Sequence, residues 1–314
     1  MLPYPSSYLF NTQNYFMKLI CLAAMALLCY SCQRKTVGSV PFNLQTYTDT
    51  RGKQMLLGLH KKEDLQQSPY REWFDKNYSD YKTDSITATL LTPLIKNKQF
   101  EIFMGTWCGD SRREVPRMYK ILEYAGVKPT QIKLLMLDDH DSVYKQSPAH
   151  EEKGKSIHRV PDLIVYDHKK EMNRVVEFPV ASLEKDLLLI MKEWSYQPNY
   201  KAAAYLLQLF KEKSVAALTK DTVQLAEKLK HLVQNSAELN SLGYVWMAAN
   251  ETEKALLVLQ LNAALYPNDA NVYDSLAEIN MKLNKKEDAG KYYRKVLELQ
   301  PANENAAKML EKLK

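Results

Sequence analysis

The sequence predicts two folded parts, an α/β domain followed by an all-α domain. Up to about residue 195, short β-prone apolar runs alternate with segments of helical periodicity, an order typical of α/β domains. From Tyr196 onward, apolar residues recur only at helical spacing, and several of them repeat after 34 residues. A length of 314 residues leaves room for both parts.

Composition excludes two broad classes of protein. Apolar residues make up 46% of the chain and charged residues 25%, which indicates a globular protein rather than a disordered one. The net charge of +6 is mild, and the sequence contains no block of five Lys or Arg. A nucleic-acid partner is therefore not expected.

Residues 1–32 are predicted to be a targeting segment. Residues 1–16 carry no charge, whereas Met17 and Lys18 are followed by an apolar run at 19–30 and then by Ser31 and Cys32. A charged start, a short apolar core and a small residue before the cut make a secretory signal peptide. The run is shorter than the roughly 20 residues that span a bilayer. We therefore expect translation to start at Met17 and the segment to be processed.

Residues 28–32, Leu-Cys-Tyr-Ser-Cys, resemble a bacterial lipobox. The resemblance implies that Cys32 is the site of lipid attachment and that the mature protein is anchored to a membrane. Plain cleavage near Ser31, which would leave Cys32 free, is the alternative. The basic Arg34 and Lys35 that follow, in place of an acidic run, favour the periplasmic face of the outer (or inner) membrane of a Gram-negative bacterium.

Residues 33–60 are predicted to be a linker and N-terminal extension with β-prone pieces at 44–47 and 55–57. Residues 61–82 carry aromatic residues at helical spacing, which predicts an aromatic helix face packed on the core. A second helix is expected over 85–95, capped by Asp84 or Ser85. Its predicted inward face consists of Ile86, Leu90, Leu91 and Leu94.

A strand at 99–104 leads through a Gly-Thr-Trp turn to Cys108, where a helix over 112–125 should begin. Pro116 falls inside that helix, where a kink is expected. The apolar run 132–137 predicts a strand buried on both faces. The polar residues that follow it at 138–141 include three Asp and His140, but they lack the spacing of a metal site, so no metal is expected.

Val160-Pro161 precedes an apolar strand at 163–166. A turn at 167–170 and a returning strand at 174–178 complete a predicted hairpin. A closing helix is expected over 182–194, capped by Ser182.

The motif Trp107-Cys108-Gly109-Asp110-Ser111, with Pro116 downstream, resembles the active site of the thioredoxin family, Trp-Cys-Gly-Pro-Cys. The resemblance implies a thioredoxin-like fold, a mixed central sheet flanked by helices, over 61–195. It implies that Cys108 is the nucleophile and that Trp107, Gly109 and Ser111 support it. It also implies that Val160-Pro161 is the family's cis-proline segment, which faces the cysteine and binds peptide. Ser111 stands where the family has its second, resolving cysteine.

Residues 200–314 resemble tetratricopeptide repeats. Pro267 and Pro301 lie 34 residues apart, and so do Ala255 and Ala289, while the small residues Gly243 and Ala277 recur at the same period. The resemblance implies about three helix pairs, the first of them degenerate at 200–233, and a polar capping helix at 303–314. It also implies a protein partner on the repeat surface.

With the targeting segment removed, Cys108 is the single thiol of the chain. A single thiol can attack a disulfide but cannot resolve the mixed disulfide it forms, whereas isomerisation needs only that first thiol. The sequence therefore predicts monothiol thiol–disulfide exchange or isomerisation on envelope proteins, without a cofactor. The alternative is a non-catalytic scaffold that binds protein partners through both domains.

Overall fold

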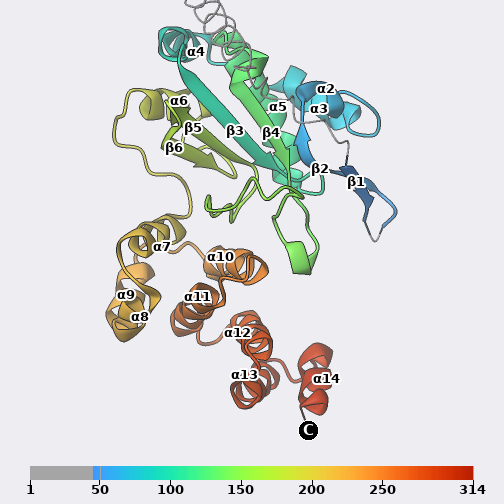
Figure 1. Ribbon diagram of the computed structural model, residues 1–314, viewed down its shortest axis with the longest axis vertical. Helices are drawn as coiled ribbons and strands as arrows, with labels where there is room; N and C mark the ends of the chain where they lie inside the picture. Colours follow the sequence, from blue (N-terminus) through green and yellow to red (C-terminus); the bar gives the residue numbers. More distant parts are fainter. Residues whose placement is uncertain (1–44, 50, 314) are drawn as a thin grey trace, which may run out of the picture. The chain divides into compact units, whose positions relative to one another are not determined.

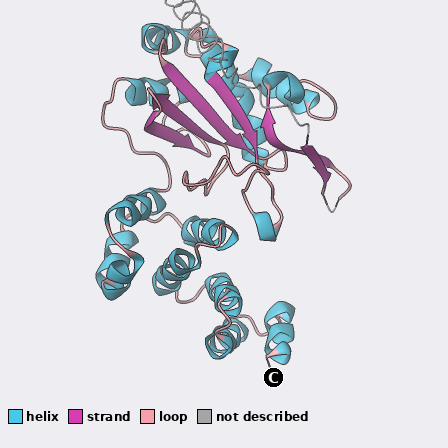
Figure 2. Ribbon diagram, viewed as in Figure 1, coloured by secondary structure: helices cyan, strands magenta, loops and turns pink. Residues whose placement is uncertain are grey.

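The computed structural model describes residues 45–49 and 51–313, and the predicted targeting segment with Cys32 lies outside these described residues. Within them, a six-stranded mixed sheet with associated helices is followed by a part made only of helices (Figure 1). Figure 2 shows that all strands belong to the first part. The prediction of an α/β domain followed by an all-α domain is confirmed at this level.

The sheet has the strand order β1-β2-β4-β3-β5-β6. Only β3 and β4 are parallel, and every other neighbouring pair is antiparallel. The β-prone pieces predicted at 44–47 and 55–57 are the strands β1 and β2 of this sheet. The strands are β1 (Gln45–Thr48), β2 (Gln54–His60), β3 (Lys98–Met104), β4 (Ile132–Met136), β5 (Asp162–Asp167) and β6 (Lys170–Val176).

Helices cover one face of the sheet. They pack on the alternate β3 side chains Phe100, Ile102 and Met104, all fully buried, because successive residues of a strand point to opposite faces. The helices of this part are α2 (Lys62–Leu65), α3 (Arg71–Asp80), α4 (Ser85–Leu91), α5 (Gly109–Tyr124) and α6 (Leu183–Met191), with short 3-10 turns at Thr92–Leu94, Pro129–Gln131 and Asp141–Val143.

The opposite face of the sheet carries a smaller cluster. Phe103 of β3 and Leu135 of β4 pack there against Ile157 and Val160, which belong to the long connection between β4 and β5. This connection, residues 137–161, therefore contributes to the core and forms the face on which Cys108 also packs.

Most of the helix predictions for this part are confirmed. The aromatic face of 61–82 packs on the core, with Tyr70 and Phe74 buried, and Ser182 caps α6 by accepting from the Lys185 N–H at 3.2 Å. The predicted inward face of the helix after Asp84 is wrong in two positions. Ile86 is 79% exposed and Leu90 48% exposed, because Leu91 and the small Ala88 make the core contact instead.

The helical part begins with three short helices rather than the predicted pair. Asp221 leaves helical geometry (φ −105°, ψ 21°) and separates α8 from α9. Longer antiparallel-type pairs follow, and a last helix stands where a capping helix was expected. The helices are α7 (Lys201–Glu212), α8 (Val215–Lys220), α9 (Thr222–Lys230), α10 (Ser236–Ala248), α11 (Thr252–Leu265), α12 (Ala270–Lys282), α13 (Lys286–Leu299) and α14 (Glu304–Lys312).

Small residues set the distance between α10 and α11. A Cβ added to Gly243 would lie 2.6 Å from Cδ2 and 2.7 Å from Cγ of Leu259, whose side chain is fully buried. Gly290 of α13 is different, since its nearest neighbour would be Arg294 Nη1 at 3.4 Å, an ordinary contact. Gly243 and Gly290 are thus a matched pair of glycines inside helices, one required by packing and one not.

We expect Gly243→Ala to lower the free energy of unfolding by about 1–3 kcal/mol, because the new methyl group overpacks the α10–α11 contact. Gly290→Ala should instead raise it by up to about 1 kcal/mol, since alanine is the better helix former. Urea denaturation followed by circular dichroism measures both. Equal effects of the two substitutions would contradict the close approach at Gly243.

Candidate functional site

Cys108 lies at the junction between β3 and α5. It is the N-cap residue of α5, with extended backbone (φ −84°, ψ 126°), and it is a free cysteine of intermediate exposure. Its Sγ donates a hydrogen bond to the carbonyl oxygen of Val160 at 3.3 Å. The prediction that a helix begins at Cys108 is confirmed, and α5 runs as one helix through Pro116.

Trp107 is fixed beside the cysteine by its indole ring. Nε1 donates to the Leu137 carbonyl oxygen at 2.8 Å, which ties the ring to the end of β4. The ring also lies over Gly105, where an added Cβ would approach Trp107 Cε2 to 2.3 Å. Glycine at 105 therefore makes room for the indole, and Trp107 forms one wall next to the sulfur.

Gly109 and Ser111 occupy different environments. Gly109 is the first residue of α5, and a Cβ there would meet open space. Ser111 is fully buried, and its Oγ accepts from the backbone N–H of Gly105 at 3.3 Å. Among the described residues, Ser111 makes no hydrogen bond to Cys108, so its hydroxyl supports the turn before the cysteine rather than the sulfur.

The peptide bond between Val160 and Pro161 is cis, as predicted. Val160 is 3% exposed, and the Pro161 carbonyl accepts from the Glu177 N–H at 2.7 Å. The structure thus brings Trp107, Cys108 and the segment before Pro161 together, although some fifty residues separate them in sequence.

The arginines that follow the cysteine are engaged elsewhere. Arg113 pairs with Asp110 at 2.7 Å and with Glu114 at 2.6 Å, and Glu114 also binds Arg117 at 3.0 Å. Glu114 is itself buried. In the first turns of α5, Asp110 and Glu114 thus pair with two of the three arginines.

A buried positive group that the sequence did not reveal lies in the β4–β5 connection. Lys145 is 4% exposed, and its Nζ donates to three oxygens: Tyr144 Oη (2.7 Å), the His158 carbonyl (2.7 Å) and Ser241 Oγ (3.0 Å). Burial lowers the pKa of Lys145 to about 7. The electrostatic interaction with Cys108 acts to raise that pKa. Lys145 and Cys108 are therefore within electrostatic range of each other.

His158 is a buried neutral group. Its Nδ1 lies 3.3 Å from the Ser156 carbonyl oxygen, so Nδ1 carries the proton, and Nε2 has no hydrogen-bond partner. Burial lowers the pKa of His158 to about 3, and the nearby charge of Lys145 acts in the same direction. In the strand that follows, burial raises the pKa of the Asp162 carboxyl although Arg174 lies 3.0 Å away.

The three polar side chains after β4 do come together. Ligand atoms of Asp138, Asp139 and His140 lie within 4.8 Å of one another. Asp138 Oδ1 already binds His140 Nδ1 at 2.6 Å, and Tyr47 Oη donates to Asp139. Their polar atoms thus satisfy one another and hold β1 against this loop.

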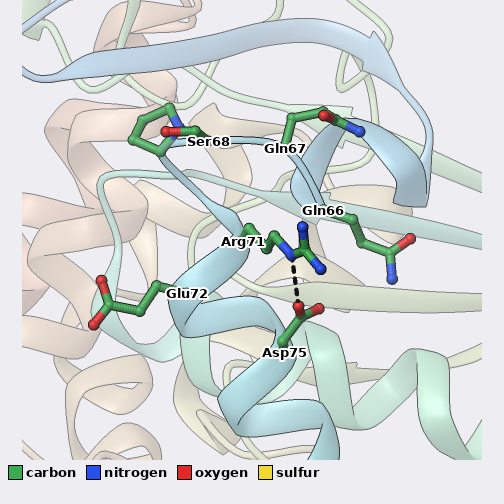
Figure 3. Close-up of a pocket in the computed structure, with 7 residues that line it drawn as sticks. Gln66, Gln67, Ser68, Arg71, Glu72 and Asp75 are labelled. Carbon is green, nitrogen blue, oxygen red and sulfur yellow. Dashed lines mark hydrogen bonds and ion pairs between the residues drawn. The ribbon is translucent and has the colours of Figure 1, made fainter.

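Described residues line a cavity on either side of the α/β part. One, of about 700 Å³, lies between the β4–β5 connection and helices α7 and α10, and its lining includes Lys145, His158, Phe210 and Trp246. The other, of about 690 Å³, lies at the turn between α2 and α3. Figure 3 shows its polar lining, in which Arg71 and Asp75 form an ion pair at 3.0 Å. None of the sequence-predicted site residues lines either cavity.

No protein-family model matches this chain, and no curated protein matches it significantly in sequence. In the part of the chain that the structure describes, no helix is both long and apolar enough to cross a bilayer.

His158 predicts an acid-sensitive step in stability. The unfolded chain binds a proton near pH 6.5 and the folded chain only near pH 3, so the stabilisation is present above pH 6.5 and is lost as the pH falls toward 3. In His158→Phe, which keeps a ring against Tyr200, the loss of unfolding free energy between pH 7 and pH 5 should be smaller by about 2 kcal/mol. Urea denaturation at the two pH values measures this. His231→Gln, at the exposed end of α9, should leave the difference unchanged, and an unaltered difference in His158→Phe would contradict the burial argument.

Proposed function

We propose that this protein is a thioredoxin-like, monothiol thiol–disulfide exchange protein or isomerase that acts on other proteins. The observation that carries the proposal is the arrangement of one thiol at a helix N-terminus against a cis-proline segment, with Cys108 Sγ 3.3 Å from the Val160 carbonyl oxygen. Helix N-termini favour negative charge, which suits a thiolate nucleophile. Cys108 is partly exposed, which is consistent with access by a substrate.

The proposed chemistry follows from Cys108 being the one thiol among the described residues. The Cys108 thiolate attacks one sulfur of a substrate disulfide, forms a mixed disulfide and releases the other sulfur as a thiolate. Ser111 has no sulfur with which to break this bond. A thiol of the substrate must do so, and when it attacks the mixed disulfide it forms a new pairing within the substrate and frees Cys108. This sequence of steps is isomerisation.

The remaining parts of the proposal concern placement and partners. We infer that a lipid on Cys32 anchors the protein at the periplasmic face of the outer (or inner) membrane of a Gram-negative cell. The helices from α10 to α14 are taken as tetratricopeptide-type repeats that bind a partner protein. The close approach of α10 and α11 at Gly243 supports this, because the repeat pattern places a small residue there.

The lack of a resolving thiol gives a stoichiometric test. In a chain with Cys21, Cys29 and Cys32 replaced by Ser, Cys108 should release one equivalent of thionitrobenzoate from Ellman's reagent and retain the mixed disulfide. Ser111→Cys should release two equivalents, because residues three apart on a helix lie within the Cα separation of a disulfide. Absorbance of the released thiolate gives the count. Ser111→Ala is the matched control and should release one; no release from the Ser111 chain, or only one equivalent from Ser111→Cys, would contradict the proposal.

Isomerisation separates the proposed enzyme from the scaffold alternative. With scrambled ribonuclease and a glutathione buffer, the protein should speed the recovery of ribonuclease activity, and Cys108→Ser should fall to the uncatalysed rate. Ribonuclease turnover measured over time gives both rates. Equal rates for the two proteins would favour the non-catalytic scaffold, in which the Cys108 groove and the repeats only bind.

A further inference from the structure

Helix α10 touches the segment that faces Cys108. Ser241 Oγ donates to the carbonyl oxygen of His158, and the same carbonyl accepts from Lys145 Nζ at 2.7 Å. Lys145 Nζ in turn donates to Ser241 Oγ at 3.0 Å. The three groups form a closed hydrogen-bonded triangle, one corner of which comes from the helical part of the chain.

A second contact lies one residue further along the same segment. Arg159 Nη2 donates to the carbonyl oxygen of Ala237 in α10 at 2.7 Å, and its Nη1 lies 3.6 Å from Glu177 Oε1. The next residue, Val160, presents the carbonyl that accepts from Cys108. Residues 158–160 are thus held by α10 on one side and meet the thiol on the other.

The backbone of the β4–β5 connection directs the Lys145 side chain toward the His158 carbonyl and Ser241. The backbone of Lys145 has left-handed geometry (φ 54°), which is uncommon for residues other than Gly, Asn or Asp. The loop before it is closed by two backbone bonds, from Lys145 N to Asp138 O and from Asp138 N to Gln146 O, both 2.9 Å. The ammonium is therefore placed by the fold and not by an exposed, freely rotating side chain.

The charges around Lys145 leave Cys108 as a natural counter-charge. All three hydrogen-bond acceptors of the ammonium are uncharged oxygens. Of the two groups that favour its charge, Cys108 and Glu177, the carboxylate already lies beside Arg159. Several titratable or charged groups surround the Lys145 ammonium: Cys108 at the start of α5, Tyr144, His158 and Arg159 of the β4–β5 connection, and Glu177 after β6. Helix α10 contributes the neutral Ser241.

We propose that Lys145, anchored by Ser241 of helix α10, is a positioning residue of the Cys108 site, so that the helical part of the chain completes this site. Lys145 holds the 158–160 segment in place for the thiol and supplies the positive charge that favours the thiolate. The proposal rests on the proposed function only in taking Cys108 as the reactive group.

The test is the rate at which iodoacetamide alkylates Cys108 in the full chain as a function of pH. The tryptic peptide 99–112 reports this cysteine alone by mass spectrometry. Lys145→Met should slow alkylation about three- to tenfold below pH 7, because a nearby positive charge is lost. Since the pKa of Lys145 is lowered to about 7, the lysine is charged below that pH and neutral above it, so the difference should shrink as the pH rises past 7. A purely structural role for Lys145 would not produce that pH dependence.

Three further variants make the result decisive. Ser241→Ala should slow alkylation in the same pH range by a smaller factor, whereas Ser241→Thr, which keeps the hydroxyl, should match the unsubstituted protein. Lys308→Met, on the exposed side of α14, is the control for the loss of one charge. If Lys145→Met fails to fold, the Ser241 pair decides the matter. Unchanged profiles in Lys145→Met and Ser241→Ala, or equal rates for the two Ser241 variants, would overturn the proposal.

This experiment is independent of disulfide exchange. If Cys108 fails to isomerise ribonuclease but its alkylation responds to Lys145 and Ser241 as described, the proposed function fails and the positioning role stands. If exchange is observed but the alkylation profiles are unchanged, the reverse holds.

Discussion

The backbone segment 158–161 is the constraint on which the site depends. Its Val160 carbonyl accepts from Cys108, and its His158 carbonyl accepts from both Lys145 and Ser241. A buried carbonyl or ammonium left without partners costs about 1–3 kcal/mol, more for the charged group. The sheet, the β4–β5 connection and helix α10 must therefore all be in place before the segment is satisfied. The Cys108 sulfur is hydrogen-bonded to this segment, so its surroundings depend on all three elements.

The distribution of charge follows from the same constraint. Arg113 and Arg117 could stabilise a thiolate, but both form ion pairs with the buried Glu114. Asp110 pairs with Arg113 as well. The β4–β5 connection places a further positive group, the buried Lys145, within electrostatic range of Cys108. A buried ammonium next to neutral oxygens is costly, and a neighbouring thiolate offsets part of that cost.

Periodicity and turn chemistry predicted much of the α/β part. The strands on either side of Cys108, the cap at Ser182 and the helix start at Cys108 all follow from local sequence, because apolar spacing and capping residues act over only a few positions. The misplaced helix face at Ile86 and Leu90 shows where this reasoning ends. A short helix can bury either of two faces, and the choice depends on which partner, here the surface that covers Ala88 and Leu91, is present.

The candidate site, too, could be predicted from the sequence only in part. Trp107, Cys108, Ser111 and Pro161 were found because they stand in a recognisable local motif. Lys145 and Ser241 carry no such signal, since one is a single lysine in a polar stretch and the other a serine within a helix. Their role arises only from a contact between residues 96 positions apart. Long-range contacts of this kind are set by the fold and leave no periodic trace in the sequence.

A one-thiol site benefits from such a contact more than a two-thiol site would. Where a second cysteine is present, the mixed disulfide is cleared from within, and its lifetime is short. In the proposed mechanism Ser111, a buried serine bonded to Gly105, offers no second thiol, so a bound substrate would stay attached until one of its own thiols attacks. During that time the substrate must be held near residues 158–161 without blocking its own thiol. Because Ser241 and the Ala237 carbonyl of α10 hold this segment, it can present a fixed edge to a substrate, while the rest of the helical part is proposed to bind a partner protein. The coupling between the two parts of the chain thus fits a capture site better than it fits a fast reductase.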